Sequence, residues 1–334
     1  MSKVTIETVA QKAGVTSATV SYALSGKRKI SAEVTERILK IVEELDYRPS
    51  ITARNLASNK TWTVGLYASP TQNIREDYFF NNILAGILDT LHVKKYQLHL
   101  YADYLSDTNK DHPDLNMTQP IDGALLMNPR INDAYIQHLK KMKIPFVVIG
   151  SPDAKNNCFY VDADLTAGYY SIVNFLIKKR HKKIIFVNGP SEYTQSEKRK
   201  TGYILAFRDN NLLFDDKWII NVQMLEEDGY RVFKKIIDEI PDFSAVITFN
   251  DTIAVGVLRA LKERNIPVPG KVAVVSAGNT MITRIFSPSI TSLDMGSYEI
   301  GSKAAELLVD VIEKKRIQTC HTIIETHLVE REST

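Results

Sequence analysis

Polar and aromatic residues recur where apolar, strand-like runs of this sequence give way to helix-like runs. They are Asp164, Arg199, Asn250 and Asp251, together with the aromatic run Tyr78, Phe79 and Phe80. Amide and carboxylate groups exchange hydrogen bonds with hydroxyl groups, and a planar guanidinium suits vicinal hydroxyls or a carboxylate. Aromatic rings stack on the apolar face of another ring. These residue types favour binding of a small molecule that carries hydroxyl groups.

Each of these residues also has an ordinary structural role. Asn and Asp after a strand are common helix N-caps, and an aromatic run usually belongs to the core. The sequence contains no GxSxG, no P-loop and no GxGxxG after the first strand-like run, and its seven histidines and two cysteines lack metal-ligand spacing. The sequence therefore predicts a binding protein, not an enzyme, without cofactor or metal.

The stretch 4–24 has the pattern of two short helices joined by a tight turn. Thr5 and Thr16 can each accept from the first free N–H groups of a helix, and Gly14 can end the first helix in the left-handed conformation. This is the pattern of a helix-turn-helix, whose second helix enters the DNA major groove. Ser17, Ala18, Ser21 and Tyr22 then form the exposed face of the second helix. The alternative is an ordinary helical hairpin.

Charge is distributed unevenly along the chain. Residues 1–60 hold ten Lys and Arg against six Asp and Glu, whereas the remaining residues hold 32 against 33. A basic head on a neutral body is typical of a nucleic-acid-binding module joined to a part that need not touch nucleic acid. The basic run 27–29 follows the second helix, where phosphates would pass, although it can also be a solvated loop.

A third helix and a linker complete the head. Ser31 can cap a helix to about Leu45 whose apolar residues fall on one stripe. Pro49 then breaks the chain, and a short helix over 51–57 is too short to be stable alone. Such a segment is a candidate switch that folds on DNA, with Leu56 wedged between minor-groove base steps. The alternative is a plain flexible linker.

From residue 63 onward, strand-like and helix-like runs alternate, which predicts parallel sheets covered on both faces. The expected strands are 64–68, 97–101, 124–127, 146–149, 159–161, 184–187, 218–222, 245–249 and 272–275. The expected helices are 82–94, 133–142, 167–179, 197–209, 230–240 and 252–264. So many strands favour two α/β subdomains over one sheet, with the ligand between them. A late helix, 297–313, is expected in the first subdomain, and a late strand, 322–329, in the second.

The sequence resembles the lac repressor/galactose repressor family of bacterial transcription regulators along essentially its whole length. The resemblance is carried by VTIETVAQKAGVTSATVSYALSG, LDYRPSITARNLAS, KRKTGYILAF, FNDTIAVGVLRAL and SPSITSLD. It implies an all-α helix-turn-helix head on an α/β body like periplasmic binding proteins, built from two doubly wound parallel-sheet subdomains. It also implies a homodimer on a palindromic operator, a hinge helix in the minor groove, and a small effector, usually a sugar.

The resemblance assigns residues to two sites. The DNA-binding set is Thr5, Thr16, Ser17, Ala18, Thr19, Ser21, Tyr22, Lys29, Ser31, Arg54, Asn55 and Leu56. The effector-binding set is Phe79, Phe80, Asp164, Arg199, Asn250, Asp251 and Asn279. Where the family often has an acidic residue after a late strand, this chain has Gly278. That departure allows a differently oriented or larger sugar, such as a disaccharide.

These expectations give a domain plan. Residues 1–46 form the DNA-binding domain, 47–61 the hinge and 62–334 the effector-binding and dimerisation domain. Within the body, the N-subdomain comprises about 62–161 plus 292–320, and the C-subdomain about 162–291 plus 321–334. No signal-peptide pattern and no apolar run of about 18 residues is present, so a cytoplasmic protein is expected. The lack of a heptad tail favours a dimer.

The expected mechanism is linkage between effector and DNA. An effector that prefers one body geometry changes DNA affinity by a coupling free energy of about 1–3 kcal/mol. An inducer would weaken operator binding and a corepressor would strengthen it. A purine or nucleoside effector is the main alternative to a sugar, and a sugar-binding receptor or sugar-metabolising enzyme is a more distant one.

Replacing Leu56 with alanine tests the hinge prediction. The substitution should weaken specific operator binding and leave non-specific binding nearly intact, because only the specific complex needs the wedge. Fluorescence anisotropy on operator and random DNA measures both affinities. An equal loss on random DNA would show that residues 47–61 act only as a linker.

Overall fold

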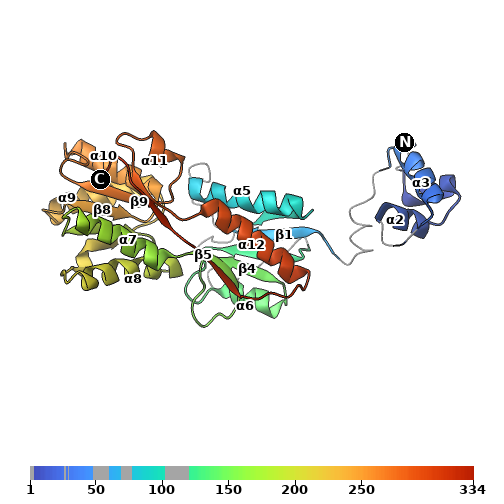
Figure 1. Ribbon diagram of the computed structural model, residues 1–334, viewed down its shortest axis with the longest axis horizontal. Helices are drawn as coiled ribbons and strands as arrows, with labels where there is room; N and C mark the ends of the chain where they lie inside the picture. Colours follow the sequence, from blue (N-terminus) through green and yellow to red (C-terminus); the bar gives the residue numbers. More distant parts are fainter. Residues whose placement is uncertain (1–3, 26–27, 29, 48–59, 69–76, 102–119) are drawn as a thin grey trace. The chain divides into compact units, whose positions relative to one another are not determined.

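The computed structural model describes residues 4–25, 28, 30–47, 60–68, 77–101 and 120–334 (Figure 1). The chain divides into two compact units, Met1–Thr61 and Trp62–Thr334, and each is considered by itself. Lys29 and the linker positions Arg54, Asn55 and Leu56 lie outside the described residues, as does the predicted hinge helix. No helix within the described ranges is long and apolar enough to cross a membrane.

The first unit is a three-helix domain made of α1 (Ile6–Ala13), α2 (Ser17–Ser25) and α3 (Ala32–Glu44). Thr5 caps α1 by accepting from the Thr8 N–H, and Gly14 ends it at φ 65°. The two helices α1 and α2 are therefore joined by the tight turn that the sequence predicts. Val20 of α2 is buried with Val9 and Ile38, which closes a small apolar core between the helices.

The second unit contains two six-stranded sheets. The first has the order β11-β5-β4-β3-β1-β2, and the second has the order β12-β10-β9-β8-β6-β7. The strands of the first are β1 (Thr63–Tyr67), β2 (Gln97–Tyr101), β3 (Gly123–Met127), β4 (Phe146–Ile149), β5 (Phe159–Ala163) and β11 (His321–Ile324). Those of the second are β6 (Ile184–Asn188), β7 (Ile219–Asn221), β8 (Ala245–Thr248), β9 (Ala273–Ala277), β10 (Thr291–Asp294) and β12 (His327–Val329). All neighbouring strands are parallel except β10 and β12.

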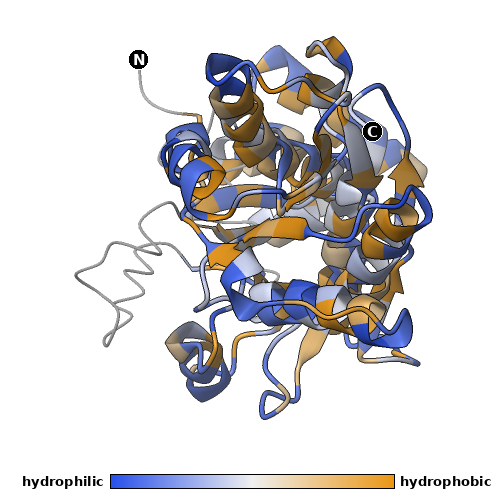
Figure 2. Ribbon diagram, turned by 90° about the vertical axis from the view of Figure 1, so that its left-hand side faces the viewer, coloured by the Kyte–Doolittle hydropathy of each residue, from blue (hydrophilic) through white to orange (hydrophobic). Residues whose placement is uncertain are grey.

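Helices cover both faces of each sheet. α5 (Tyr78–Val93) and α12 (Ser297–Ile312) pack together on one face of the first sheet, and α6 (Ala134–Lys141) covers the other (Figure 1). The second sheet lies between the pair α7 (Leu165–Lys178) and α8 (Thr194–Asp209) and the pair α9 (Glu226–Glu239) and α10 (Asp251–Glu263). The short elements η3 (Asp216–Trp218) and α11 (Met281–Ile285) complete it. Figure 2 shows hydrophobic strands between helices that have both hydrophobic and hydrophilic residues. This is expected for a sheet that helices cover on both faces.

The predicted fold class is confirmed, but the prediction for the last strand was wrong. Residues 322–329 were expected to form one strand in the second subdomain. The structure instead has two short strands: β11 pairs with β5 in the first sheet, and β12 pairs with β10 in the second. The first subdomain therefore also contains β11. The strands β5 and β10 reach Ala163 and Asp294, so the chain passes between the sheets two or three residues later than expected.

The helix pairs approach so closely that glycine is required at their crossings. A Cβ atom on Gly86 of α5 would lie 2.1 Å from the Tyr298 carbonyl oxygen of α12. A Cβ atom on Gly256 of α10 would lie 2.2 Å from the Glu226 carbonyl oxygen of α9. Both contacts are with backbone, which cannot swing away. Backbone-to-backbone packing thus fixes α5 against α12 and α9 against α10.

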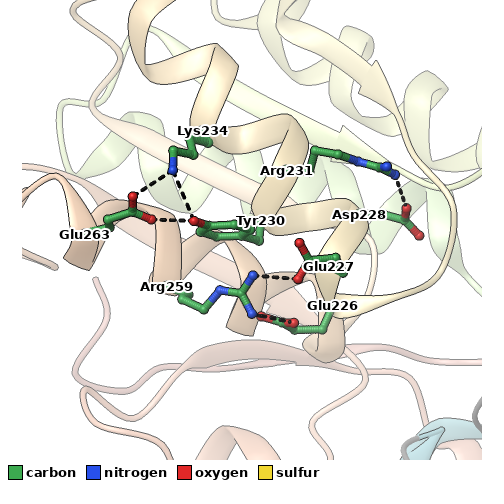
Figure 3. Close-up of polar contacts among 8 residues, drawn as sticks. All are labelled: Glu226, Glu227, Asp228, Tyr230, Arg231, Lys234, Arg259 and Glu263. Atoms are coloured by element: carbon green, nitrogen blue, oxygen red, sulfur yellow. Dashed lines mark hydrogen bonds and ion pairs between the residues drawn. The ribbon is translucent and has the colours of Figure 1, made fainter.

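A cluster of charged residues lies along the surface where α9 meets α10 (Figure 3). The Arg259 guanidinium lies 3.6 Å from the centre of the Tyr230 ring and forms ion pairs with Glu226 and Glu227. At the hydroxyl end of the Tyr230 ring, Glu263 accepts a hydrogen bond from Lys234 Nζ at 2.7 Å. These exposed groups satisfy one another, so the cluster acts as a surface brace between two helices.

Candidate functional site

The exposed face of α2 carries the residues predicted to read DNA bases. Ala18 is exposed, and Ser17, Ser21 and Tyr22 are half-buried, while Val20 on the opposite side is in the core. The Arg28 guanidinium lies 5.8 Å from the centre of the Tyr22 ring, which brings a cation beside this face. Small and amphipathic side chains beside a cation suit entry into a major groove.

Three of the assigned DNA-binding residues lie at helix starts. Thr5 and Ser31 accept from backbone N–H groups of α1 and α3, and Thr16 accepts from the Thr19 N–H at 3.2 Å. The Thr16 and Thr19 hydroxyl groups are 2.9 Å apart. Each side chain is at least partly accessible, so it stabilises a helix end and is still exposed to solvent.

A cavity lies in the body, with residues that follow strands of both sheets around it. Part of its space is open to solvent. A concave site lined by apolar surface and a few polar groups is typical of small-molecule binding. Its lining comprises Asp77, Phe79, Ile83, Met127, Asn128, Ile149, Gly150, Asp162, Ala163, Leu165, Pro190, Tyr193, Gln195, Ser196, Arg199, Met224, Phe249, Asn250, Ala277, Met295 and Ile300.

Arg199 is the cationic group of the cavity lining. Its guanidinium lies 5.4 Å from the centre of the Phe249 ring, and its Nε is buried without a hydrogen-bond partner among the described residues. Burial lowers the pKa of Arg199, because removal from water penalises the charged form. A buried donor without an acceptor is costly, so Arg199 Nε is a candidate donor to a ligand in the cavity.

Side-chain amides supply further polar groups. Asn250 uses its Oδ1 to accept from the Ile253 N–H at 2.8 Å, which leaves its Nδ2 as a donor. Asn128 directly follows β3, and Gln195 belongs to the first turn of α8. The remaining surface is largely apolar and includes Phe79. This combination matches a ring with hydroxyl groups on its edge and apolar faces.

Four residues assigned to the effector site are not part of the cavity lining. Phe80 is buried in the core, because α5 begins at Tyr78 and turns Phe79 to the cavity instead. Asp164 caps α7 by accepting from the Ala167 N–H. Asp251 is buried and accepts from Ser276, Ser292 and Thr280. Asn279 bonds to Asp294 and Arg331. Phe79, Arg199 and Asn250 do line the cavity.

Asp162 was missed by the sequence analysis. It belongs to β5 and precedes Asp164 by two residues. It lines the cavity and is only 3% exposed. Burial raises the pKa of Asp162, whereas the hydrogen bonds from Ser151 and the charge of Lys198 act in the opposite direction. The choice of Asp164 depended on ending the strand at Val161, whereas β5 continues to Ala163 and includes Asp162.

The structure explains why no acidic side chain is present at position 278. Gly278 has φ 130°, a conformation that other residues rarely adopt, and a Cβ atom there would lie 2.8 Å from Asp251 Oδ2. An acidic side chain at position 278 would place a second carboxylate against that of Asp251. The space on this side of the site is therefore used by the buried Asp251.

Replacing Gly278 with alanine is expected to lower the free energy of unfolding by about 2 kcal/mol, through backbone strain and contact with Asp251. Gly270→Ala is the control, because a Cβ atom there would meet only Pro267 at 3.5 Å. Denaturant unfolding measures both. Equal stability of the two variants would contradict the role given to Gly278.

Comparison with known proteins identifies the family. The model of bacterial regulatory proteins of the lacI family matches residues 5–50, and that of the periplasmic binding protein-like domain matches residues 173–334. Catabolite control protein A of Priestia megaterium is 30% identical over 336 residues, which cover 99% of both chains. The chain belongs to the lacI family. It is therefore a transcriptional regulator, as its relatives are, with a helix-turn-helix head and a ligand-binding body.

Two further relatives differ in what their names state. The HTH-type transcriptional repressor PurR of Histophilus somni is 29% identical over 327 residues, covering 97% of this chain and 96% of the relative. The solved complex of the transcriptional regulator CelR with cellobiose has a TM-score of 0.77 and 27% identity, covering 99% of this lacI-family chain and 100% of the other. The resemblance inferred from the sequence is confirmed.

Proposed function

We propose that this lacI-family regulator is a repressor of sugar uptake or catabolism genes, controlled by a small sugar bound in the body cavity. The observation that supports this most strongly is the cavity itself: Arg199 Nε, buried without a hydrogen-bond partner among the described residues, and the side-chain amides of Asn128, Gln195 and Asn250 line it together with apolar surface. The cellobiose complex of the related CelR also supports a sugar.

We further propose that each part of the chain has the function predicted from the sequence. Residues 1–46 bind the operator, 47–61 form the hinge, and 62–334 bind the effector and dimerise. Ser17, Ala18 and Tyr22 read bases, Leu56 opens the central step, and Phe79, Arg199 and Asn250 bind the effector. The regulator works in the cytoplasm, where its operator is.

A homodimer follows from the operator that such a head requires. Helix-turn-helix dimers bind two half-sites of a palindrome, and the two-fold symmetry of the protein matches that of the DNA. Apolar residues are available for the contact between protomers: Leu88 is 46% exposed and Ile285 is 68% exposed. Folding two hinge segments on DNA depends on how the bodies hold them, so an effector that favours one body geometry changes operator affinity.

A purine effector is the second candidate, because the related PurR proteins cover almost the whole chain. The aromatic residues Phe79 and Phe249 would then stack on a base. The Arg199 guanidinium lies 5.4 Å from the centre of the Phe249 ring. Because this cation already occupies a position beside the ring, a sugar effector is favoured over a stacked base.

Isothermal titration calorimetry of the full-length protein separates the two candidates. The ligands are glucose, galactose, cellobiose, maltose and lactose in one set, and adenine, guanine, hypoxanthine and adenosine in the other. The proposal predicts saturable binding of at least one sugar and no binding of the purine compounds. Binding of a purine compound alone would replace the sugar by a purine effector, and the DNA-binding function would stand.

A further inference from the structure

We propose that Asp162 is a specificity-determining contact that accepts a hydrogen bond from a hydroxyl group of the effector, and that Lys198 positions it from the opposite subdomain. The contact to an effector hydroxyl rests on the proposed function. The positioning role of Lys198 does not, because it concerns the protein without ligand.

Ser151 is the centre of a small buried network that holds Asp162. It is 3% exposed and follows β4 of the first sheet. Its N–H and hydroxyl groups both donate to Asp162 Oδ2, at 2.9 Å and 2.7 Å. Lys198 Nζ donates to Ser151 Oγ at 2.5 Å and lies 3.8 Å from Asp162 Oδ2. A carboxylate removed from water is held in one orientation by these groups.

Asp162 keeps one acceptor position open. Its Oδ2 already accepts two hydrogen bonds, whereas Oδ1 accepts only from the Ala163 N–H at 2.9 Å among the described residues. A carboxylate oxygen can accept two hydrogen bonds, and Asp162 lines the cavity. The open position therefore accepts a donor from the ligand. A neutral hydroxyl group fits best, because Arg199 also lines the cavity and disfavours a second cation.

The network crosses between the two subdomains. Ser151 and Asp162 belong to the first-sheet side, whereas Lys198 lies on α8, which covers the second sheet. Further hydrogen bonds cross the same junction. Thr194 Oγ1 donates to the Ser151 carbonyl at 2.6 Å and is 3.4 Å from the Pro129 carbonyl oxygen, the Thr194 N–H donates to the Pro129 carbonyl, and the Ile131 N–H donates to the Glu192 carbonyl. Opening the cleft would separate Lys198 from Asp162. The strength of the effector contact is thus linked to the geometry of the body.

Amide hydrogen exchange of the ligand-free, full-length protein tests the positioning role. The reporters are peptides that contain Ile131 and Thr194, whose N–H groups bond across the junction. Lys198→Met should raise their exchange rates at least about tenfold, and Lys198→Arg should restore the wild-type rates. Lys200→Met, two residues along the same helix, is the control and should change nothing.

A double-mutant cycle then asks whether Lys198 acts through Asp162. If it does, Lys198→Met combined with Asp162→Asn should raise exchange no more than the larger single effect. Unchanged exchange in Lys198→Met, or effects that add in the double variant, would overturn the positioning role.

Calorimetry tests the contact to the ligand, with the tightest-binding sugar of the five named above. Asp162→Asn should weaken binding about tenfold or more, whereas Asp164→Asn should not, because asparagine still caps α7 and position 164 does not line the cavity. If the wild type binds a sugar and Asp162→Asn binds it equally well, the contact is overturned and the sugar effector stands. If the wild type binds none of the sugars, both fail, and the exchange experiment still decides the role of Lys198.

Discussion

Replacing Arg199 with methionine is expected to weaken effector binding about 100-fold, equivalent to about 2.7 kcal/mol, and to abolish the effector response. Operator affinity without effector should change less than twofold, because Arg199 lies in the body cavity and not in the helix-turn-helix head. Methionine retains the apolar contact with Phe249 but cannot donate hydrogen bonds. Calorimetry and fluorescence anisotropy on operator DNA measure the two affinities.

The same substitution should leave the protein as stable or make it slightly more stable. The wild-type Nε is a buried donor without a partner among the described residues, and removing it relieves a desolvation cost. Arg208→Met on the same helix is the control, since Arg208 is exposed and pairs with Asp209. A clear loss of stability in Arg199→Met, together with an unchanged effector response, would assign Arg199 to the framework and not to the ligand.

Replacing Asp251 with alanine is expected to lower the free energy of unfolding by about 3 kcal/mol or more. The carboxylate is 3% exposed and accepts from the hydroxyl groups of Ser276, Ser292 and Thr280 and from the Thr280 N–H. Removing it leaves several buried donors without an acceptor, each costing about 1–3 kcal/mol before relaxation. Chemical denaturation of the full-length protein measures the loss.

Asp251→Asn provides the matched comparison, because an amide has the same shape and one oxygen that still accepts. Burial raises the pKa of Asp251, so the folded protein already opposes its charge, and the neutral amide should be tolerated better than alanine. A stability for the alanine variant within about 0.5 kcal/mol of wild type would contradict the framework role given to Asp251.

Local chemistry made the head predictable from the sequence. Thr5, Gly14 and Ser31 determine where helices begin and end within a few residues, so each boundary depends on near neighbours. The turn between the first two helices follows directly. The alternation of strands and helices in the body was equally readable, because apolar periodicity is also a local property.

The lining of the cavity was harder to predict, because it depends on where each strand ends. A strand expected to end at Val161 made Asp164 the predicted effector contact, whereas β5 continues to Ala163 and Asp162 lines the cavity. Two residues of strand thus decide which carboxylate lines the cavity. The same rule of examining strand ends would have found Asn128, which follows β3 directly.

The late strands depend on contacts that the sequence does not display locally. β11 and β12 are three or four residues long and lie close together in the chain, yet they join different sheets. Their assignment is decided by partners more than 150 residues away in one case, β5, and by β10 in the other. Periodicity marks such residues as extended but cannot choose between two sheet edges.

Operator binding in the presence and absence of ligand tests the central claim most directly. Fluorescence anisotropy of the full-length protein would use DNA upstream of its own operon, with each sugar and each purine compound in turn. The account predicts tight, salt-sensitive binding that one sugar releases, with Arg199→Met retaining the binding but not the release. Tight binding that no sugar changes would contradict the sugar effector, and no specific binding under any condition would contradict repression through this DNA.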